Sequence, residues 1–211
     1  MMHTIKDKVI VGITGGIGSG KTEVCRILAN EGFKVFFADP IAKELYTSNK
    51  KLADKIVKEF GKGILNFKGK ISLAKLKKLI FEDDASYEKI NKIVHPVVID
   101  HLIKEIRKCD ENIVVIESAL VFESGLDKDV DYVIMVYSNK KNRLDRIRLR
   151  DEATKTQVEK VMKHQMDEKE KIEKSDFVIV NNKSLKELEA QVVFIGKVLK
   201  ALKKRDKRKK K

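Results

Sequence analysis

Tryptophan is absent from this chain of 211 residues, and there are only two prolines and two cysteines. Cys25 and Cys109 lie far apart in the sequence, so they predict neither a disulfide framework nor a metal site. No apolar run approaches the roughly 18 residues that a membrane-spanning helix requires. The short apolar run near the N-terminus lacks the cleavage site of a signal peptide. We therefore expect a reducing, cytoplasmic setting and no membrane partner.

Length and charge narrow the class of protein further. The chain is long enough for one full core with a small insertion, which we expect to form a single domain over residues 1–202. Half of the net charge of +14 lies in residues 203–211, which hold eight basic residues and Asp206. We expect this tail to lack fixed structure and to bind polyanions only weakly, through screened charge. No aromatic residues accompany it, so we expect no specific nucleic-acid partner. We also expect a monomer or weak homo-oligomer.

A glycine-rich motif dominates the N-terminal part of the chain. It follows an apolar run, precedes a helical pattern and fits the spacing G-x-x-x-x-G-K-[ST], with Gly15, Gly16, Ile17, Gly18, Ser19, Gly20, Lys21 and Thr22. Such a loop turns successive backbone N–H groups toward one point, where the N-terminus of the next helix adds a favourable dipole for phosphate. Lys21 would reach the terminal phosphates and the Thr22 hydroxyl would bind Mg²⁺. The alternative is a glycine-rich turn without a ligand.

Five apolar, β-branched segments alternate with helical patterns along the chain, over residues 8–14, 34–38, 113–116, 132–137 and 177–180. Such segments are typical of buried parallel strands and predict an α/β fold with a mainly parallel sheet. Residues 41–107 contain no convincing strand and predict a helical insertion, whose helix we expect to break or kink at Pro96. Ser184 and Glu187 have the spacing of a capping box and predict the start of the last helix.

Carboxylates follow two of the predicted strands. Asp39 comes directly after the second strand, and ligands of open α/β sheets bind at the carboxyl ends of the strands. We favour a catalytic or substrate-binding role for Asp39, although it would also suit a helix N-cap with Pro40 in the first turn. Glu117 ends the third strand, where it could hold Mg²⁺ through water or simply face solvent.

Four arginines lie within eight residues after the fourth strand, in a protein otherwise rich in lysine. On a helix, Arg143, Arg146 and Arg150 share one face, whereas Arg148 points elsewhere. The planar guanidinium binds phosphate oxygens in pairs, so we favour Arg146 and Arg150 as phosphate contacts. The alternative is a solvated helix face. We expect residues 140–166 to form a lid over the nucleotide.

Together these features resemble the dephospho-coenzyme A kinase family over nearly all of residues 9–202. The resemblance rests on the phosphate loop, Asp39, His95-Pro96, Leu120 to Glu123, Arg146 through Arg150-Asp151, Gln165 and the segment from Asp176 to Asn181. It implies a three-layer P-loop fold of the nucleoside-monophosphate-kinase type, with a helical insertion that holds the acceptor. It departs from the usual family pattern at Glu117, where an aspartate is common.

The reaction that this resemblance implies is transfer of the γ-phosphate of ATP to the ribose 3′-hydroxyl of dephospho-CoA, the last step of CoA synthesis. Asp39 corresponds to the general base, with Lys21 and Arg146 as the other catalytic residues. His95 and Glu123 join Asp39 in binding the acceptor, and Thr22 binds Mg²⁺. The residues assigned to ATP are Gly15, Gly16, Ile17, Gly18, Ser19, Gly20, Lys21, Thr22, Glu23, Arg146, Arg150 and Asn181.

Three other functions compete with this one. Another small-metabolite kinase of the same fold would differ only in its acceptor. A GTPase switch would require N-K-x-D, but Leu185 stands at the position of the aspartate after Asn182-Lys183. A nucleic-acid-binding NTPase would explain the charge, although no aromatic stacking pattern accompanies the basic residues.

Overall fold

The structure is a computed structural model that describes residues 5, 8–150, 162–163 and 165–202. The chain forms two compact units, one of which spans Phe37–Glu105 and is called here the helical unit. The other, the sheet unit, comprises Met1–Phe36 and Ile106–Lys211. Within the described residues, no helix is long and apolar enough to cross a membrane.

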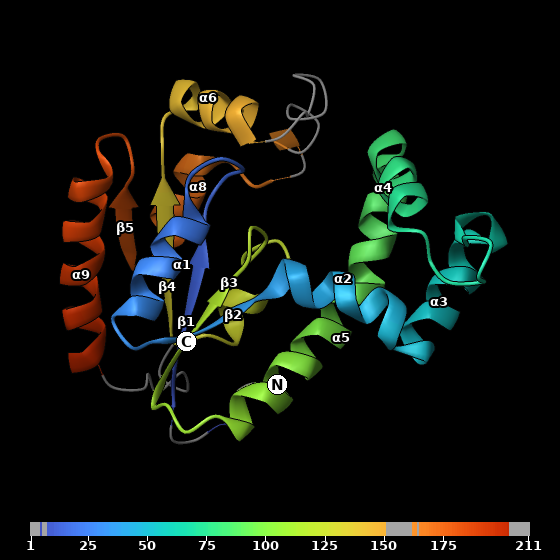
Figure 1. Ribbon diagram of the computed structural model, residues 1–211, viewed down its shortest axis with the longest axis horizontal. Coiled ribbons are helices and arrows are strands. Elements are labelled where there is room, and N and C mark those ends of the chain that lie inside the picture. The colour runs from blue at the N-terminus through green and yellow to red at the C-terminus, as the bar shows by residue number, and fades with distance from the viewer. Residues whose placement is uncertain (1–4, 6–7, 151–161, 164, 203–211) are drawn as a thin grey trace. The chain divides into compact units, whose positions relative to one another are not determined.

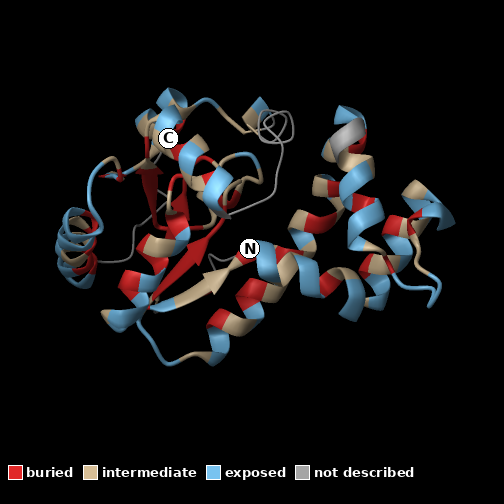
Figure 2. Cartoon of the chain, turned by 45° about the horizontal axis from the view of Figure 1, so that its top comes forward, coloured by how far each residue is buried: buried red, intermediate tan, exposed pale blue. Residues whose placement is uncertain are grey.

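The sheet has five strands in the order β2-β3-β1-β4-β5, and Figure 1 shows them side by side. The strands are β1 (Val9–Thr14), β2 (Lys34–Phe37), β3 (Ile113–Glu117), β4 (Tyr132–Tyr137) and β5 (Phe177–Val180). The central strand β1 pairs in parallel with β3 and β4, and β4 pairs in parallel with β5. Strands β1, β3 and β4 are almost entirely buried (Figure 2), which explains why their sequences are apolar throughout instead of alternating.

The helices of the sheet unit are α1 (Lys21–Asn30), α6 (Lys140–Arg150), α8 (Glu168–Lys174) and α9 (Leu185–Ala201), with a 3₁₀ turn, η3 (Leu126–Lys128). Helix α1 contacts β1, β3 and α9, whereas α8 contacts β4. Close packing of α9 depends on Gly196, where a Cβ atom would lie 3.3 Å from the ring of Phe33. The predicted α/β fold with five mainly parallel strands is therefore confirmed.

The last helix begins at the predicted capping box and also covers the sheet edge. Ser184 accepts a hydrogen bond from the amide of Glu187, whose carboxylate accepts one from the amide of Ser184. One turn further along α9, the Gln191 side chain accepts from the amide of Val180 at 3.2 Å and donates to its carbonyl at 3.0 Å. Both backbone groups of Val180, the last residue of edge strand β5, are thus hydrogen-bonded to one side chain.

The helical unit consists of α2 (Ala38–Ser48), α3 (Lys50–Phe60), the 3₁₀ turn η2 (Lys62–Ile64), α4 (Leu73–Glu82) and α5 (Asp84–Lys108), which continues into the sheet unit. Helix α5 runs without interruption through Pro96, so a break at this proline was wrong, whereas a kink there stays a prediction. Val94 and Val98 are buried on either side of Pro96. A proline inside a helix costs roughly 3 kcal/mol, and burial of apolar side chains such as these is the kind of gain that can offset it. The boundaries proposed for the insertion and the lid remain predictions, and residues 203–211 lie outside the described residues.

Candidate active site

The phosphate loop occupies residues 15–20, between the end of β1 and the start of α1. Gly20 caps α1 with a φ of +97°, and a Cβ there would lie 2.2 Å from Nδ2 of Asn181. Gly16 is required for a different reason, because a Cβ there would lie 2.6 Å from the guanidinium carbon of Arg143. The loop closes on itself through the amide of Ser19, which donates to the carbonyl of Gly16 at 3.1 Å. Glycine therefore shapes a tight loop against two polar side chains.

Lys21 lies across the mouth of this loop. Its ammonium donates to the carbonyl of Gly15 at 2.9 Å and lies 4.0 Å from the Glu117 carboxylate, and both side chains are largely buried. Glu117 sits beside the loop because it pairs in register with Ile13, near the end of β1. This burial contradicts the interpretation of Glu117 as a solvated strand end. The site thus presents one ammonium and one carboxylate next to a phosphate loop.

Three further residues of the loop and α1 differ in their surroundings. Ser19 is fully buried, and its hydroxyl has no hydrogen-bond partner among the described residues. Thr22 is exposed, whereas Glu23 forms an ion pair with Arg26. Cys25 lies inside α1, where burial, reinforced by the charge of Glu117, raises the pKa of its thiol far above the usual range. Cys25 is therefore neutral and unsuited to nucleophilic chemistry.

Arg146 and Asn181 hold the second half of the loop, and their predicted contacts with ATP stay a prediction. The guanidinium of Arg146 donates to the Ser19 carbonyl at 3.3 Å and to the Asn181 carbonyl at 2.9 Å. The Asn181 side chain donates to the Ser19 carbonyl at 2.9 Å and is buried. The two residues reach this point from α6 and from the end of β5.

Sequence reasoning did not assign Arg143 and Gln165 to the site, but the structure places both against the loop. Arg143 donates from Nε to the carbonyl of Ile17 at 2.8 Å, and the Gln165 side chain accepts from the Ile17 amide at 3.1 Å. The shared face of Arg143 and Arg146 on α6 was the only signal for Arg143. Arg148 is exposed, as expected, and the side chain of Arg150 lies outside the described part of the chain.

Glu123, predicted to bind substrate, forms an ion pair with the buried side chain of Lys171. Its carboxylate lies 2.8 Å from the ammonium of Lys171 and accepts a hydrogen bond from the amide of Met166 at 2.8 Å. The Lys171 side chain is only 1% exposed and also donates to the carbonyl of Ala119. These contacts link the loop after β3 to helix α8.

Asp39 and His95 belong to the helical unit and are described within it. Asp39 lies in the first turn of α2, whose N-cap is Phe37, so the N-cap alternative for Asp39 was wrong. The helix begins two residues earlier than Pro40, at Ala38. Asp39 is exposed. Burial of the Tyr46 phenol, reinforced by the negative charge of Asp39, raises the pKa of Tyr46 to about 12. His95 is half-buried on α5.

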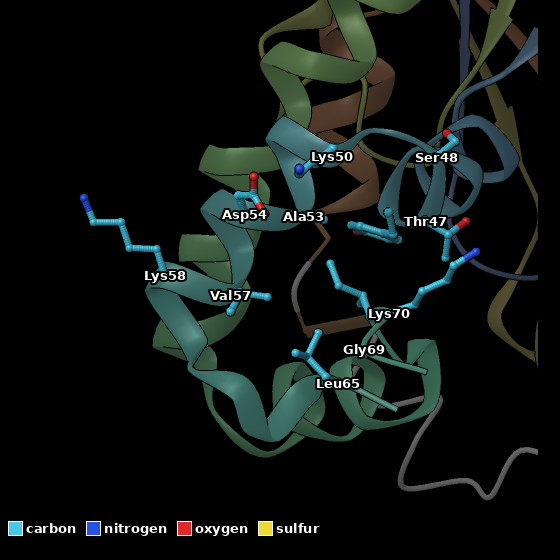
Figure 3. A pocket seen from close by; sticks show the side chains of 12 residues that line it. Thr47, Ser48, Lys50, Ala53, Asp54, Val57, Lys58, Leu65, Gly69 and Lys70 are labelled. Carbon is cyan, nitrogen blue, oxygen red and sulfur yellow. The ribbon is translucent and has the colours of Figure 1, made fainter. Parts of the chain in front are cut away.

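The helical unit also contains a cavity of ≈ 530 Å³ between the end of α2, helix α3 and the hairpin around Gly69. Apolar side chains such as Val57 and Leu65 line it together with the hydroxyls of Thr47 and Ser48. Figure 3 shows these residues and shows that Lys58 extends away from the others. The volume of this cavity falls in the range of small-molecule sites, about 300–1,000 Å³.

Comparison with known proteins decides what kind of site this is. A dephospho-CoA kinase family model matches residues 9–187. This chain belongs to the dephospho-CoA kinase family. A dephospho-CoA kinase from Fusobacterium nucleatum is 40% identical over 180 residues, which cover 85% of this chain and 93% of that protein.

Solved structures agree with this membership in the dephospho-CoA kinase family. The dephospho-CoA kinase from Campylobacter jejuni is 27% identical with a TM-score of 0.66, and the match covers 91% of this chain and 98% of that one. The protein TT1252 from Thermus thermophilus has the same identity, 27%, with a TM-score of 0.78 and coverage of 94% and 100%. The family consists of P-loop kinases that use ATP and catalyse the final step of CoA biosynthesis.

Proposed function

We propose that this chain transfers the γ-phosphate of ATP to the ribose 3′-hydroxyl of dephospho-CoA, giving CoA and ADP. The observation that carries the proposal is family membership over residues 9–187 together with a formed phosphate loop around Lys21. In the reaction, the 3′-oxygen forms a bond to the γ-phosphorus, and the bond from that phosphorus to the β–γ bridging oxygen breaks. ADP leaves, and the proton of the hydroxyl passes to Asp39 as general base.

The loop and α1 would bind the phosphates of ATP. Lys21 lies at the loop mouth and would move from the Gly15 carbonyl and Glu117 to the terminal phosphates. The guanidinium of Arg146 donates to the Ser19 carbonyl of the loop. Its positive charge would also stabilise the transferring phosphoryl group. The remaining nucleotide contacts that we propose are those of Thr22, Glu23, Arg150 and Asn181.

Hard oxygen donors beside the loop fit Mg²⁺. The exposed Thr22 hydroxyl and the Glu117 carboxylate are the residues that would hold it, Glu117 through water. Bound Mg²⁺ neutralises charge on the β- and γ-phosphates.

Dephospho-CoA would bind to the helical unit. We propose Asp39 and His95 of the helical unit as acceptor contacts, as the family resemblance implies. The same resemblance implies a further acceptor contact from Glu123, which belongs to the sheet unit. The cavity lined by Val57 and Leu65 supports an acceptor site in the helical unit, because it combines an apolar surface with hydroxyls and lysines. We also propose that the chain acts in the cytoplasm as a monomer or weak homo-oligomer.

The decisive experiment measures ADP formation from ATP with dephospho-CoA, adenosine, shikimate and gluconate offered separately. We expect stimulation by dephospho-CoA alone, and equal stimulation by another acceptor would refute the assignment. Lys21→Ala should abolish the reaction while the protein still folds, because the Lys21 ammonium serves the transferred phosphate. An Ala53→Phe variant should fill the cavity of the helical unit and raise the KM for dephospho-CoA, while the KM for ATP stays unchanged.

A further inference from the structure

The peptide groups around Ile17 are held at both ends by residues from outside the phosphate loop. The Ile17 amide donates to Oε1 of Gln165 at 3.1 Å, and the Ile17 carbonyl accepts from Nε of Arg143 at 2.8 Å. These two partners lie 148 and 126 residues further along the chain. We refer to Arg143, Gln165 and Glu168 as the loop clamp.

Arg143 is fixed in this position by its surroundings. The residue is only 4% exposed, and its Nη1 forms an ion pair with Glu168 of α8. A Cβ atom at Gly16 would lie 2.6 Å from the guanidinium carbon of Arg143, so any side chain there would have to push Arg143 away. Two different nitrogens of one guanidinium therefore serve the loop carbonyl and the carboxylate at once, which a lysine ammonium cannot reproduce in the same geometry.

Holding the carbonyl of Ile17 also orients the next amide. In a trans peptide the C=O and the following N–H point in opposite directions, so a carbonyl drawn outward to Arg143 turns the Gly18 amide toward the other side of the loop. The Ser19 carbonyl, held by Arg146 and Asn181, does the same for Gly20. Among the described residues, the Gly18 and Gly20 amides have no protein acceptor, which leaves them available to an anion.

We propose that Arg143 and Gln165 are positioning residues for ATP: they keep the phosphate loop in its binding conformation before the nucleotide arrives. This inference rests on the proposed function, because it assigns ATP to this loop. A loop that is already ordered does not have to lose backbone freedom when it binds. Glu168 contributes indirectly, by keeping the Arg143 guanidinium in place.

The test compares Arg143→Lys and Gln165→Leu with a matched control, Arg148→Lys, on the full chain. Arg148 is exposed on the same helix, so its replacement changes the same chemistry away from the loop. We expect the first two variants to raise the Kd for ATP roughly 5- to 30-fold each, the factor for fixing about one residue's backbone, ~1–2 kcal/mol. The KM for ATP should rise likewise, with little change in kcat at saturating ATP or in the KM for dephospho-CoA.

Hydrogen exchange of the ligand-free proteins provides a second readout, because the clamp should slow opening of the loop. Amides of residues 15–20 should exchange faster in Arg143→Lys and Gln165→Leu than in the control, and those of the helical unit should not. If both variants match Arg148→Lys in ATP affinity, the inference is wrong, even if exchange changes. If Arg143→Lys does not fold, Gln165→Leu decides alone. If the two variants bind ATP more weakly than wild-type protein, as expected, but wild-type protein does not phosphorylate dephospho-CoA, the proposed function fails and the inference stands.

Discussion

Replacing Glu123 with glutamine would leave the ammonium of Lys171 buried without its counter-charge. The Lys171 side chain is 1% exposed, and its other hydrogen bond goes to the carbonyl of Ala119. Leaving a buried charge without its partner costs about 3–5 kcal/mol. For a chain of this length, each kcal/mol lowers Tm by about 2–4 °C, so Glu123→Gln should lower Tm by roughly 6–20 °C.

The double variant Glu123→Gln/Lys171→Met provides the matched comparison, because it removes both charges and keeps an unbranched chain at position 171. We expect it to recover at least half of the lost free energy of unfolding, measured by urea denaturation at constant pH. A loss below ~1 kcal/mol in the single variant, the usual value of an exposed pair, would refute the reasoning. So would a double variant no more stable than the single one. The KM for dephospho-CoA of the double variant then tests the acceptor role proposed for Glu123, which predicts a rise independent of stability.

Three further predictions concern two single residues and the basic tail. Asp39→Asn should lower kcat by roughly 10²–10⁴-fold, the range for a general base; a steady-state measurement that finds only a higher KM would make Asp39 an acceptor-positioning residue. Ser19→Ala removes a buried hydroxyl without a described partner, so thermal unfolding should show equal or higher stability, by up to ~1 kcal/mol; clear destabilisation would contradict this. Deleting residues 203–211 should leave kcat and both KM values unchanged and weaken retention on heparin at low salt; a several-fold fall in kcat with unchanged Tm would show that the tail reaches the active site.

The strands and the phosphate loop could be predicted because their signals are local. A buried parallel strand is apolar on both faces, and all five predicted strands have bounds within one residue of those observed. The second was predicted to include Ala38, which instead begins α2. Local propensity could not decide between a strand end and a first helical turn at that residue.

Other features depend on tertiary contacts that local patterns do not encode. Proline inside α5 is tolerated because Val94 and Val98 pack on either side of it, and the sequence alone does not show what they pack against. Gln165 and Arg143 meet Ile17 across more than a hundred residues of chain. The spacing of arginines on α6 indicated a functional face but could not distinguish a residue that holds the loop from one that contacts phosphate.

The hydrogen bonds of Gln191 to Val180 have a consequence for self-association. Edge strands can recruit a strand from another molecule, because their outer N–H and C=O groups are unpaired. Val178 and Val180 are both exposed on β5, so this edge would otherwise offer an apolar surface along with backbone groups. A strand that arrives in register must first displace an amide that already satisfies both groups of Val180. At Val180, the side chain of Gln191 thus occupies the place that one residue of a sixth strand would take.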